Sequence, residues 1–237
     1  MLETVATGGM SNFNLPQIVL AIGSLGTAAY GVVDITKGFG GGISNRGFGD
    51  IKKVVSKFIP STSEGTASAS ALALTSVLAT LRANWINGMA LADQKSVAKA
   101  LVKLNLTRAT AKGMAVAAGV DGDLLTSVAD KIASGAALSQ QETDVHGRFD
   151  VLLQAMLDQG YQRADQRYRN SAKLLAVPVA IALALLGAWA ISGSSLTSGD
   201  TLRALVGGLL ATPLAPVAKD LASAIQAGAK VAQAWKV

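Results

Sequence analysis

Two long runs without a charged residue constrain this chain more than any other feature of its sequence. The run from Leu15 to Val33 has nineteen residues and the run from Leu174 to Gly193 has twenty. A helix needs about 20 apolar residues to cross a hydrocarbon core about 30 Å thick. A third run, from Ala204 to Ala218, has fifteen uncharged residues before Lys219. We therefore predict about three transmembrane helices; the alternative for each run is a buried helix of a water-soluble protein.

The positive charges gather on one side of these runs. Residues 1–14 and 194–202 contain no Lys or Arg, and Glu3 precedes the first run, which argues against a cleaved signal peptide. An excess of Lys and Arg marks cytoplasmic segments of membrane proteins. We expect a multi-pass protein of the bacterial inner membrane, with the N-terminus outside and both the middle domain and the C-terminus in the cytoplasm. The cations on the inner flanks are Lys37, Arg46, Lys52, Lys53, Lys57, Arg163, Arg167, Arg169 and Lys173, and the tail carries Lys230 and Lys236.

The composition excludes several chemistries. Charged residues make up 15% of the chain, against roughly 25% in a globular domain. The chain has no cysteine and one histidine, His146, so disulfides, thiolate sites and a His-rich metal site within one chain are excluded. No Ser-His-Asp arrangement can be assigned. We expect no enzyme activity, no catalytic residue, no cofactor and no metal, and we attribute the net charge of +6 to membrane flanks rather than to nucleic-acid binding.

The middle of the chain reads as helices, which makes the predicted class an all-α integral membrane protein. We place the first segment and span at 1–37, a cytoplasmic helical domain at 38–172, and the other two spans with the tail at 173–237. Ser139 and Glu142 form a predicted capping box for a helix that runs from about residue 140 to 192. Its apolar face is Phe149, Leu152, Leu153, Met156, Leu157, Tyr161, Ala164 and Tyr168.

Three shorter helices are expected before it. Apolar residues recur at helical spacing between Leu74 and Met89, and the uncharged stretch at residues 65–81 leaves a re-entrant membrane helix open as an alternative. The next helix has Val97, Leu101 and Leu104 on one face with lysines opposite. The third ends at Gly135, a typical C-cap. The acids Asp121, Asp123, Asp144 and Asp150 are interpreted as solvated.

Six glycines follow the first span within residues 37–50. A phosphate-binding loop needs Lys and Ser or Thr after its last glycine, but Phe48 and Gly49 stand there. A dinucleotide fingerprint fails because no strand precedes the glycines. We interpret them as a hinge between the spanning helix and a basic amphipathic helix at 47–59 that lies on the membrane surface. The hinge residues are Gly38, Gly40, Gly41, Gly42, Gly47 and Gly49.

The amphipathic helix has Ile51, Val54, Val55, Phe58 and Ile59 on one side and lysines around the other. We expect it to lie on the anionic inner leaflet, where each basic residue adds attraction. Arginines just before the second span are expected to anchor in the same way. The predicted membrane-surface anchor residues are Lys52, Lys53, Lys57, Arg163, Arg167, Arg169 and Lys173.

Charged residues also occur at the ends of two spans. Asp34 ends the first, and Lys219 and Asp220 end the third. In the predicted topology all three lie at similar depth, and pairing lowers the cost of a charge in lipid. We predict an intramembrane ion pair between Asp34 and Lys219, within one chain or across a subunit boundary. A structural pair is favoured over an ion or proton site.

Small residues and prolines in the spans predict close helix contacts. Gly23, Gly26 and Ala29 recur at near-helical spacing, and Gly207 and Gly208 offer a second close approach. Pro178, Pro213 and Pro216 are expected to kink their helices.

The predicted function is that of a structural or accessory subunit of an oligomeric membrane assembly, without catalysis. The alternative is a small homo-oligomeric ion channel or transporter with Asp34 and Lys219 near the pore. The expected partners are anionic membrane lipids, further copies of the chain and other membrane-complex subunits, with no nucleic acid.

Overall fold

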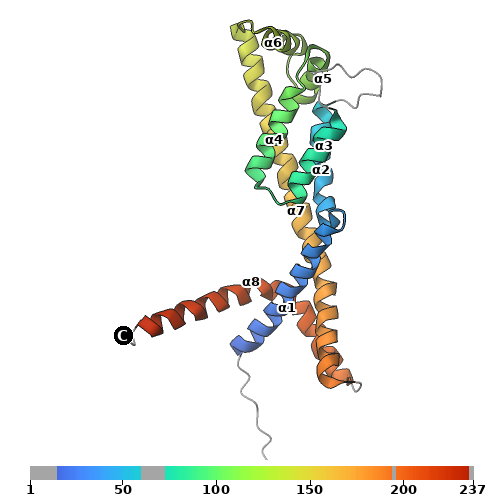
Figure 1. The fold of residues 1–237 in the computed structure, drawn as a ribbon, viewed down its shortest axis with the longest axis vertical. Helices are drawn as coiled ribbons and strands as arrows, with labels where there is room; N and C mark the ends of the chain where they lie inside the picture. The colour runs from blue at the N-terminus through green and yellow to red at the C-terminus, as the bar shows by residue number, and fades with distance from the viewer. Residues whose placement is uncertain (1–14, 60–72, 194–195, 235–237) are drawn as a thin grey trace, which may run out of the picture. The chain divides into compact units, whose positions relative to one another are not determined.

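The computed structural model describes residues 15–59, 73–193 and 196–234, and the side chains up to residue 227. Within these ranges every regular element is a helix, so the predicted all-α class is confirmed (Figure 1). Three helices, α1, α7 and α8, are long and apolar enough to cross a membrane. The α-helices are α1 (Leu15–Ile35), α2 (Asn45–Phe58), α3 (Leu74–Ile86), α4 (Leu91–Leu104), α5 (Arg108–Ala118), α6 (Gly122–Ser134), α7 (Gln140–Ser192) and α8 (Ser198–Ala234), with 3₁₀ turns η1 (Thr36–Gly38) and η2 (Gly42–Ser44) between α1 and α2.

The described chain divides into two compact units. One, here called the apolar unit, contains residues 15–36, 172–193 and 196–234. The other, the core unit, contains residues 37–59 and 73–171, where the sequence placed a domain at 38–172. Helix α7 is continuous and contributes to both units.

Helix α7 runs without a break from Gln140 to Ser192, which confirms the predicted long helix. Pro178 lies inside it. Only 11% of its most apolar stretch is buried, and large side chains such as Leu174 and Trp189 are exposed. An apolar surface of this extent is typical of a segment that meets lipid or another protein.

Helices α1 and α8 pack through small residues, as the sequence predicted for Gly23 and Gly26. A Cβ on Gly26 would overlap the carbonyl of Ala211, and a Cβ on Gly23 would overlap the Cβ of Ala218. The two backbones therefore approach as closely as glycine allows. The partner of α1 is thus a helix of the same chain.

Helix α8 is longer than the third predicted span and contains Pro213 and Pro216. A proline inside a helix removes a backbone hydrogen bond and kinks the axis, and α8 bends along its length in Figure 1. A Cβ on Gly208 would lie 2.6 Å from the Cα of Ile181 on α7, whereas Gly207 has no atom within 4 Å of such a position. The predicted close approach is therefore made by Gly208 alone.

The core unit buries one apolar cluster supplied by α2 to α7. The predicted stripe on α7 lies in its centre, with Phe149, Leu153, Leu157 and Tyr161 at most 1% exposed. The Phe149 ring meets the Phe58 ring of α2 edge to face, with 6.2 Å between centroids. Burial raises the pKa of the Tyr161 phenol, and its hydroxyl donates to the Gln94 carbonyl at 3.3 Å.

The apolar face of α2 corrects the membrane-surface interpretation of residues 47–59. Ile51, Val55 and Phe58 are at most 1% exposed and belong to the protein core, so this face is not available to lipid. A protein core and a lipid surface select the same amphipathic pattern, and the sequence could not separate them. Lys52, Lys53 and Lys57 are exposed, and their role as anchors stays a prediction.

Helix α3 begins at Leu74 and packs into the same core. Val77, Leu81 and Trp85 are buried, as the stripe predicted, while Met89 lies beyond the helix end and is 37% exposed. The re-entrant alternative is therefore wrong for residues 74–81, and residues 65–72 lie outside the described residues.

Helix α4 packs Val97 and Leu101 against the core, as predicted, but Leu104 does not belong to that face. Its buried residues are Gln94, Ala98 and Val102, and Leu104 is exposed. The lysines are not opposite the core: Lys95 pairs with Asp158, and Lys99 with Asp150 at 2.6 Å. Lys103 lies 2.9 Å from Asp150, so the solvated interpretation of Asp150 is wrong.

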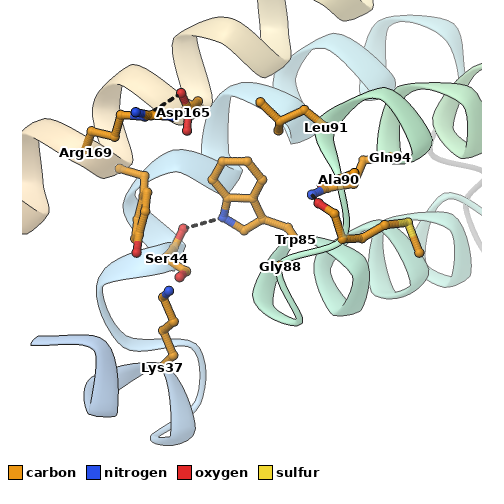
Figure 2. Close-up of a pocket in the computed structure, with 11 residues that line it drawn as sticks. Lys37, Ser44, Trp85, Gly88, Ala90, Leu91, Gln94, Asp165 and Arg169 are labelled. Carbon is orange, nitrogen blue, oxygen red and sulfur yellow. Dashed lines mark hydrogen bonds and ion pairs between the residues drawn. The ribbon is translucent and has the colours of Figure 1, made fainter. Parts of the chain in front are cut away.

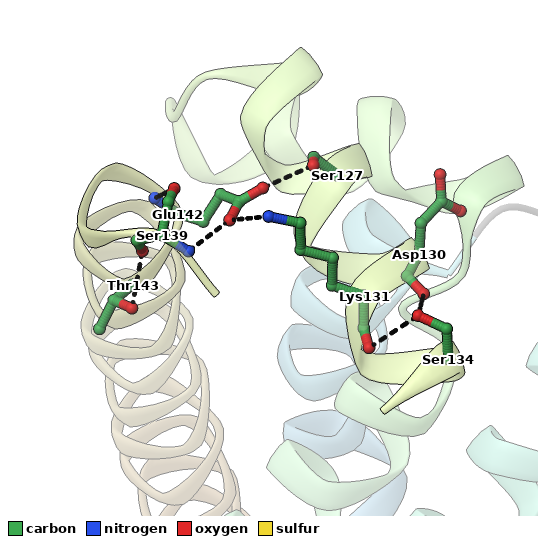
Figure 3. A network of polar contacts seen from close by, with 7 residues as sticks. All are labelled: Ser127, Asp130, Lys131, Ser134, Ser139, Glu142 and Thr143. Carbon is green, nitrogen blue, oxygen red and sulfur yellow. Dashed lines mark hydrogen bonds and ion pairs between the residues drawn. The ribbon is translucent and has the colours of Figure 1, made fainter. Parts of the chain in front are cut away.

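The junction between α6 and α7 is held by the predicted caps (Figure 3). The Ser139 N–H donates to Glu142 Oε2 at 2.6 Å, and the Glu142 N–H donates to Ser139 Oγ at 3.4 Å, which confirms the capping box. Glu142 also accepts from Lys131 at 2.7 Å and from Ser127 at 2.6 Å. Gly135 ends α6 at φ 73°, the predicted C-cap.

These contacts make the core unit sensitive to acid through Glu142. Hydrogen bonds from Lys131, Ser127 and Ser139 lower the pKa of Glu142 from 4.5 to about 2. A carboxyl group with a lowered pKa in the fold stabilises it above pH 4.5, and this contribution is lost as the pH falls toward 2. We expect Glu142→Gln to lower the urea midpoint at pH 7 and to converge with the wild type near pH 2. Trp85 fluorescence in a Trp189→Phe/Trp235→Phe background measures the midpoint.

The exposed acid Asp144 gives the matched control, because Asp144→Asn makes the same charge change near the start of α7. It should leave the pH dependence of the midpoint as in the wild type. An equal loss in both variants at pH 7 would contradict the assigned role of Glu142.

Candidate functional site

The glycine segment forms a tight turn rather than a phosphate loop. Gly40, Gly41 and Gly42 have φ of 66°, 93° and 42°, a region that residues with a Cβ rarely adopt. They connect η1 to η2, and α2 follows at once. Glycine therefore allows the tight turn between η1 and η2.

Helix α3 holds this turn in place. Arg82 donates from Nη2 to the Gly40 carbonyl and, at 3.0 Å, to Asn45 Oδ1. The indole N–H of Trp85 donates to the buried Ser44 carbonyl at 2.9 Å. The turn is thus bonded to a core helix at two points.

The other hinge glycines have different roles. Gly47 lies inside α2, where a Cβ would overlap the Ala164 carbonyl of α7 and lie 2.8 Å from the Trp85 ring. It therefore permits close packing of α2 on α7. Gly38 and Gly49 have open space at the Cβ position, so only three of the six predicted hinge residues form the turn by positive φ.

A pocket of about 290 Å³ lies beside the turn (Figure 2). Its aromatic wall is Trp85 and Tyr168, whose rings meet edge to face at 6.2 Å. Lys37 Nζ lies 5.1 Å from the centroid of the Tyr168 ring, and Arg169 Nε lies 2.8 Å from Asp165 Oδ2. The pocket thus combines two cations, one acid and two aromatic rings, all within the core unit.

Gln94 supplies a buried polar group to the same pocket. Its side-chain amide donates to the Met89 carbonyl at 2.6 Å, which fixes the orientation of the amide. Gln94 is 2% exposed, and its Oε1 has no hydrogen-bond partner among the described residues. A buried acceptor without a donor is uncommon and costly in a native fold.

The predicted arginine anchors are exposed but partly engaged. Arg167 Nε lies 3.2 Å from Oδ2 of Asp50, a carboxylate of α2 that is 7% exposed. Arg169 pairs with Asp165, as described above. Arg163 and Lys173 are exposed on α7.

The predicted pair of Asp34 with Lys219 is wrong within one chain. Ala218 packs on Gly23, so Lys219 lies near the level of Gly23 along α1. At 1.5 Å per residue, residues 23 and 34 are roughly 16 Å apart along the helix, too far for the two side chains to meet. Asp34, Lys219 and Asp220 are exposed, and a pair across a subunit boundary stays a prediction.

No described group of three or more His, Asp or Glu side chains is placed to hold a metal ion. His146 is half-buried, with the charges of Lys103 and Asp150 nearby. Burial lowers its pKa, the Lys103 charge lowers it further, and Asp150 opposes them.

Sequence reasoning named Lys37, Tyr168 and Arg169 for other roles and did not predict that they line one pocket. It did not single out Gln94 of the pocket, nor Arg82, which bonds to the glycine turn. The glycines near Lys37 were the only signal of a turn in the sequence. The side chains that hold this turn lie about 40 residues further along the chain. Only tertiary packing joins them.

The fold and this pocket define an all-helical protein with three helices able to cross a membrane and a helical unit that carries a basic, aromatic pocket. No family model, no curated protein and no solved structure matches the chain.

Proposed function

We propose that this chain is a structural or accessory subunit of an oligomeric membrane assembly. The observation that carries the proposal is the exposed apolar surface of the helices in the apolar unit. Besides α7, helix α8 exposes Leu202, Val206 and Leu209, each at least 48%. Lipid and neighbouring subunits are the surroundings that cover such surfaces.

The contacts of α1 support a role in an assembly rather than a role as a simple membrane anchor. Its small-residue face is already filled by α8 of the same chain. Its outer face still presents Ile18 and Val32, 37% and 43% exposed. The surface left for other subunits is therefore the large-residue face of α1, α7 and α8.

The proposed orientation has the N-terminus outside and the core unit in the cytoplasm, because the cations flank the spans on that side. The only argument for a cytoplasmic C-terminus is the positive charge of Lys230 and Lys236. The α1–α8 contact argues against α8 as one straight crossing: Gly23 faces Leu214 and Ala218, while Gly26 faces Ala211. The helices therefore pack in opposite senses there, whereas three straight crossings would make them parallel.

The oligomeric state in detergent tests the proposal. We expect the purified protein to need detergent and to give a protein mass of several chains by light scattering. A chain that disperses in buffer without detergent as a monomer would overturn the membrane role. A detergent-solubilised monomer at all concentrations would overturn the assembly role.

A charge swap tests the remaining form of the Asp34–Lys219 pair. If the pair joins two subunits, Asp34→Lys and Lys219→Asp should each shift the oligomer toward monomer by roughly tenfold in Kd, and the double variant should restore it. Glu3→Lys, a charge reversal outside the spans, serves as a control. An unchanged oligomer mass in both single variants would rule out a pair between subunits. If those two variants also altered ion flux in liposomes, the channel alternative would be favoured.

A further inference from the structure

We propose that a basic face of α2 and α7 binds an acidic segment of a neighbouring protein. The inference rests on the proposed function and adds to it the chemistry of the partner. The basic face lies wholly within the core unit. It consists of Arg46, Lys53 and Lys57 on α2 and of Arg163 and Arg167 on α7.

One ion pair shows that the cations of the two helices face the same way. The α2 members and Asp50 recur at intervals of three or four residues, which places them on one side of that helix. Arg163 and Arg167 share one side of α7 in the same way. Arg167 Nε lies 3.2 Å from Oδ2 of Asp50, so these two sides adjoin.

Glycine brings the two helices close together along this seam. A Cβ on Gly47 would overlap the Ala164 carbonyl, and a Cβ on Gly160 would lie 2.8 Å from Cγ2 of Val54. These contacts run in opposite directions along the two sequences, so α2 and α7 are antiparallel. The cations therefore form one continuous surface, which measures roughly 16 Å from the first to the last cation of α2 at 1.5 Å per residue.

The basic face has an excess of positive charge. All five members are exposed, and the one acid beside them, Asp50, is buried and paired with Arg167. The other four members have no ion-pair partner among the described residues. By contrast, the lysines of α4, α5 and α6 each lie within 2.9 Å of a carboxylate oxygen. The basic face is thus where the core unit leaves cations for an outside acid.

The side chains beside the arginines suit a peptide. A hollow of about 260 Å³ on α7 is lined by Arg163, Gln166, Arg167, Asn170 and Ser171. Guanidinium groups bind carboxylates through paired hydrogen bonds. The amides of Gln166 and Asn170 can both donate to and accept from peptide groups. A segment that carries Glu or Asp side chains on a peptide backbone satisfies both kinds of group.

Lipid and single-stranded nucleic acid fit the same face less well. The apolar side chains of α2, such as Ile51 and Val55, are buried in the core, so this face cannot insert apolar groups between lipids as an interfacial helix does. Single-stranded nucleic acids stack their bases on aromatic side chains, and no member of the basic face is aromatic. An acidic protein segment needs neither contact, and the proposed assembly supplies protein neighbours.

Fluorescence anisotropy of the full chain in a non-ionic detergent tests the face. The probe is a fluorescein-labelled peptide of three Glu-Glu-Ala-Ala repeats. Lys53→Gln/Arg163→Gln removes two exposed cations and breaks no described ion pair, and we expect the Kd of the probe to rise about fivefold or more. Arg108→Gln/Lys112→Gln makes the same charge change on α5 and should leave the Kd within about twofold of the wild type.

Three outcomes would overturn the proposal. The first is no binding of the probe by the wild type. The second is equal weakening in both variants, which would show attraction by net charge alone. The third is displacement of the probe by dihexanoyl-phosphatidylglycerol, or by oligo(dT) of the same charge, at a lower concentration than the unlabelled peptide requires; this would assign the face to lipid or to nucleic acid. The assembly proposal fails separately, through a detergent-solubilised monomer.

Discussion

Gly26→Leu is expected to separate α1 from α8 and to cause the largest loss of stability in the apolar unit. A Cβ at this position overlaps the Ala211 carbonyl and lies 2.6 Å from its carbon atom, and backbone atoms cannot move aside as a flexible side chain can. Overpacking costs about 1–3 kcal/mol in ordinary cores, and we expect about 3 kcal/mol or more here. Unfolding by dodecyl sulfate in mixed micelles, followed by fluorescence, measures the loss.

Gly31→Leu is the matched control, because it makes the same substitution on the same helix where no atom lies within 4 Å. Leucine is the better helix former by about 0.8 kcal/mol, so this variant should be as stable as the wild type or more stable. Similar losses in both variants would contradict the close α1–α8 contact.

Gly47→Ala is expected to be the most damaging single-methyl change in the core unit. The added methyl group overlaps the Ala164 carbonyl and meets the Trp85 ring at 2.8 Å. The strain of about 1–3 kcal/mol opposes a helix-propensity gain of about 1 kcal/mol. We expect a net fall in the urea midpoint together with a shift of the Trp85 emission maximum.

Gly49→Ala, two residues along α2, should have the opposite sign. Its Cβ position is open, so the propensity gain of up to about 1 kcal/mol is unopposed. A stabilising Gly47→Ala would show that α2 and α7 do not pack as closely as described.

Features fixed by neighbouring residues could be predicted from the sequence. The Ser139–Glu142 box, the Gly135 cap and the unbroken α7 depend on spacings within one or two turns. The core stripe of α7 followed from its period. In each case the signal and its physical cause lie in the same short segment.

Features that depend on distant partners could not be predicted. Lys95 and Lys99 looked solvated because their aspartates lie on α7, more than 50 residues later. The apolar face of α2 fits lipid and protein equally well by pattern. The predicted Asp34–Lys219 pair assumed three straight crossings, in which α1 and α8 would be parallel. The contacts of Gly23 and Gly26 show that the two helices pack in opposite senses.

The α1–α8 contact also sets a delay during synthesis. Ala211 follows Gly26 by 185 residues, which a ribosome adding about 5–20 residues per second needs roughly 10–40 s to translate. Throughout that interval the glycine face of α1 has been made and its partner has not. A newly made chain therefore depends on whatever occupies that face in the meantime, and a neighbouring copy at high expression could take the place of its own α8.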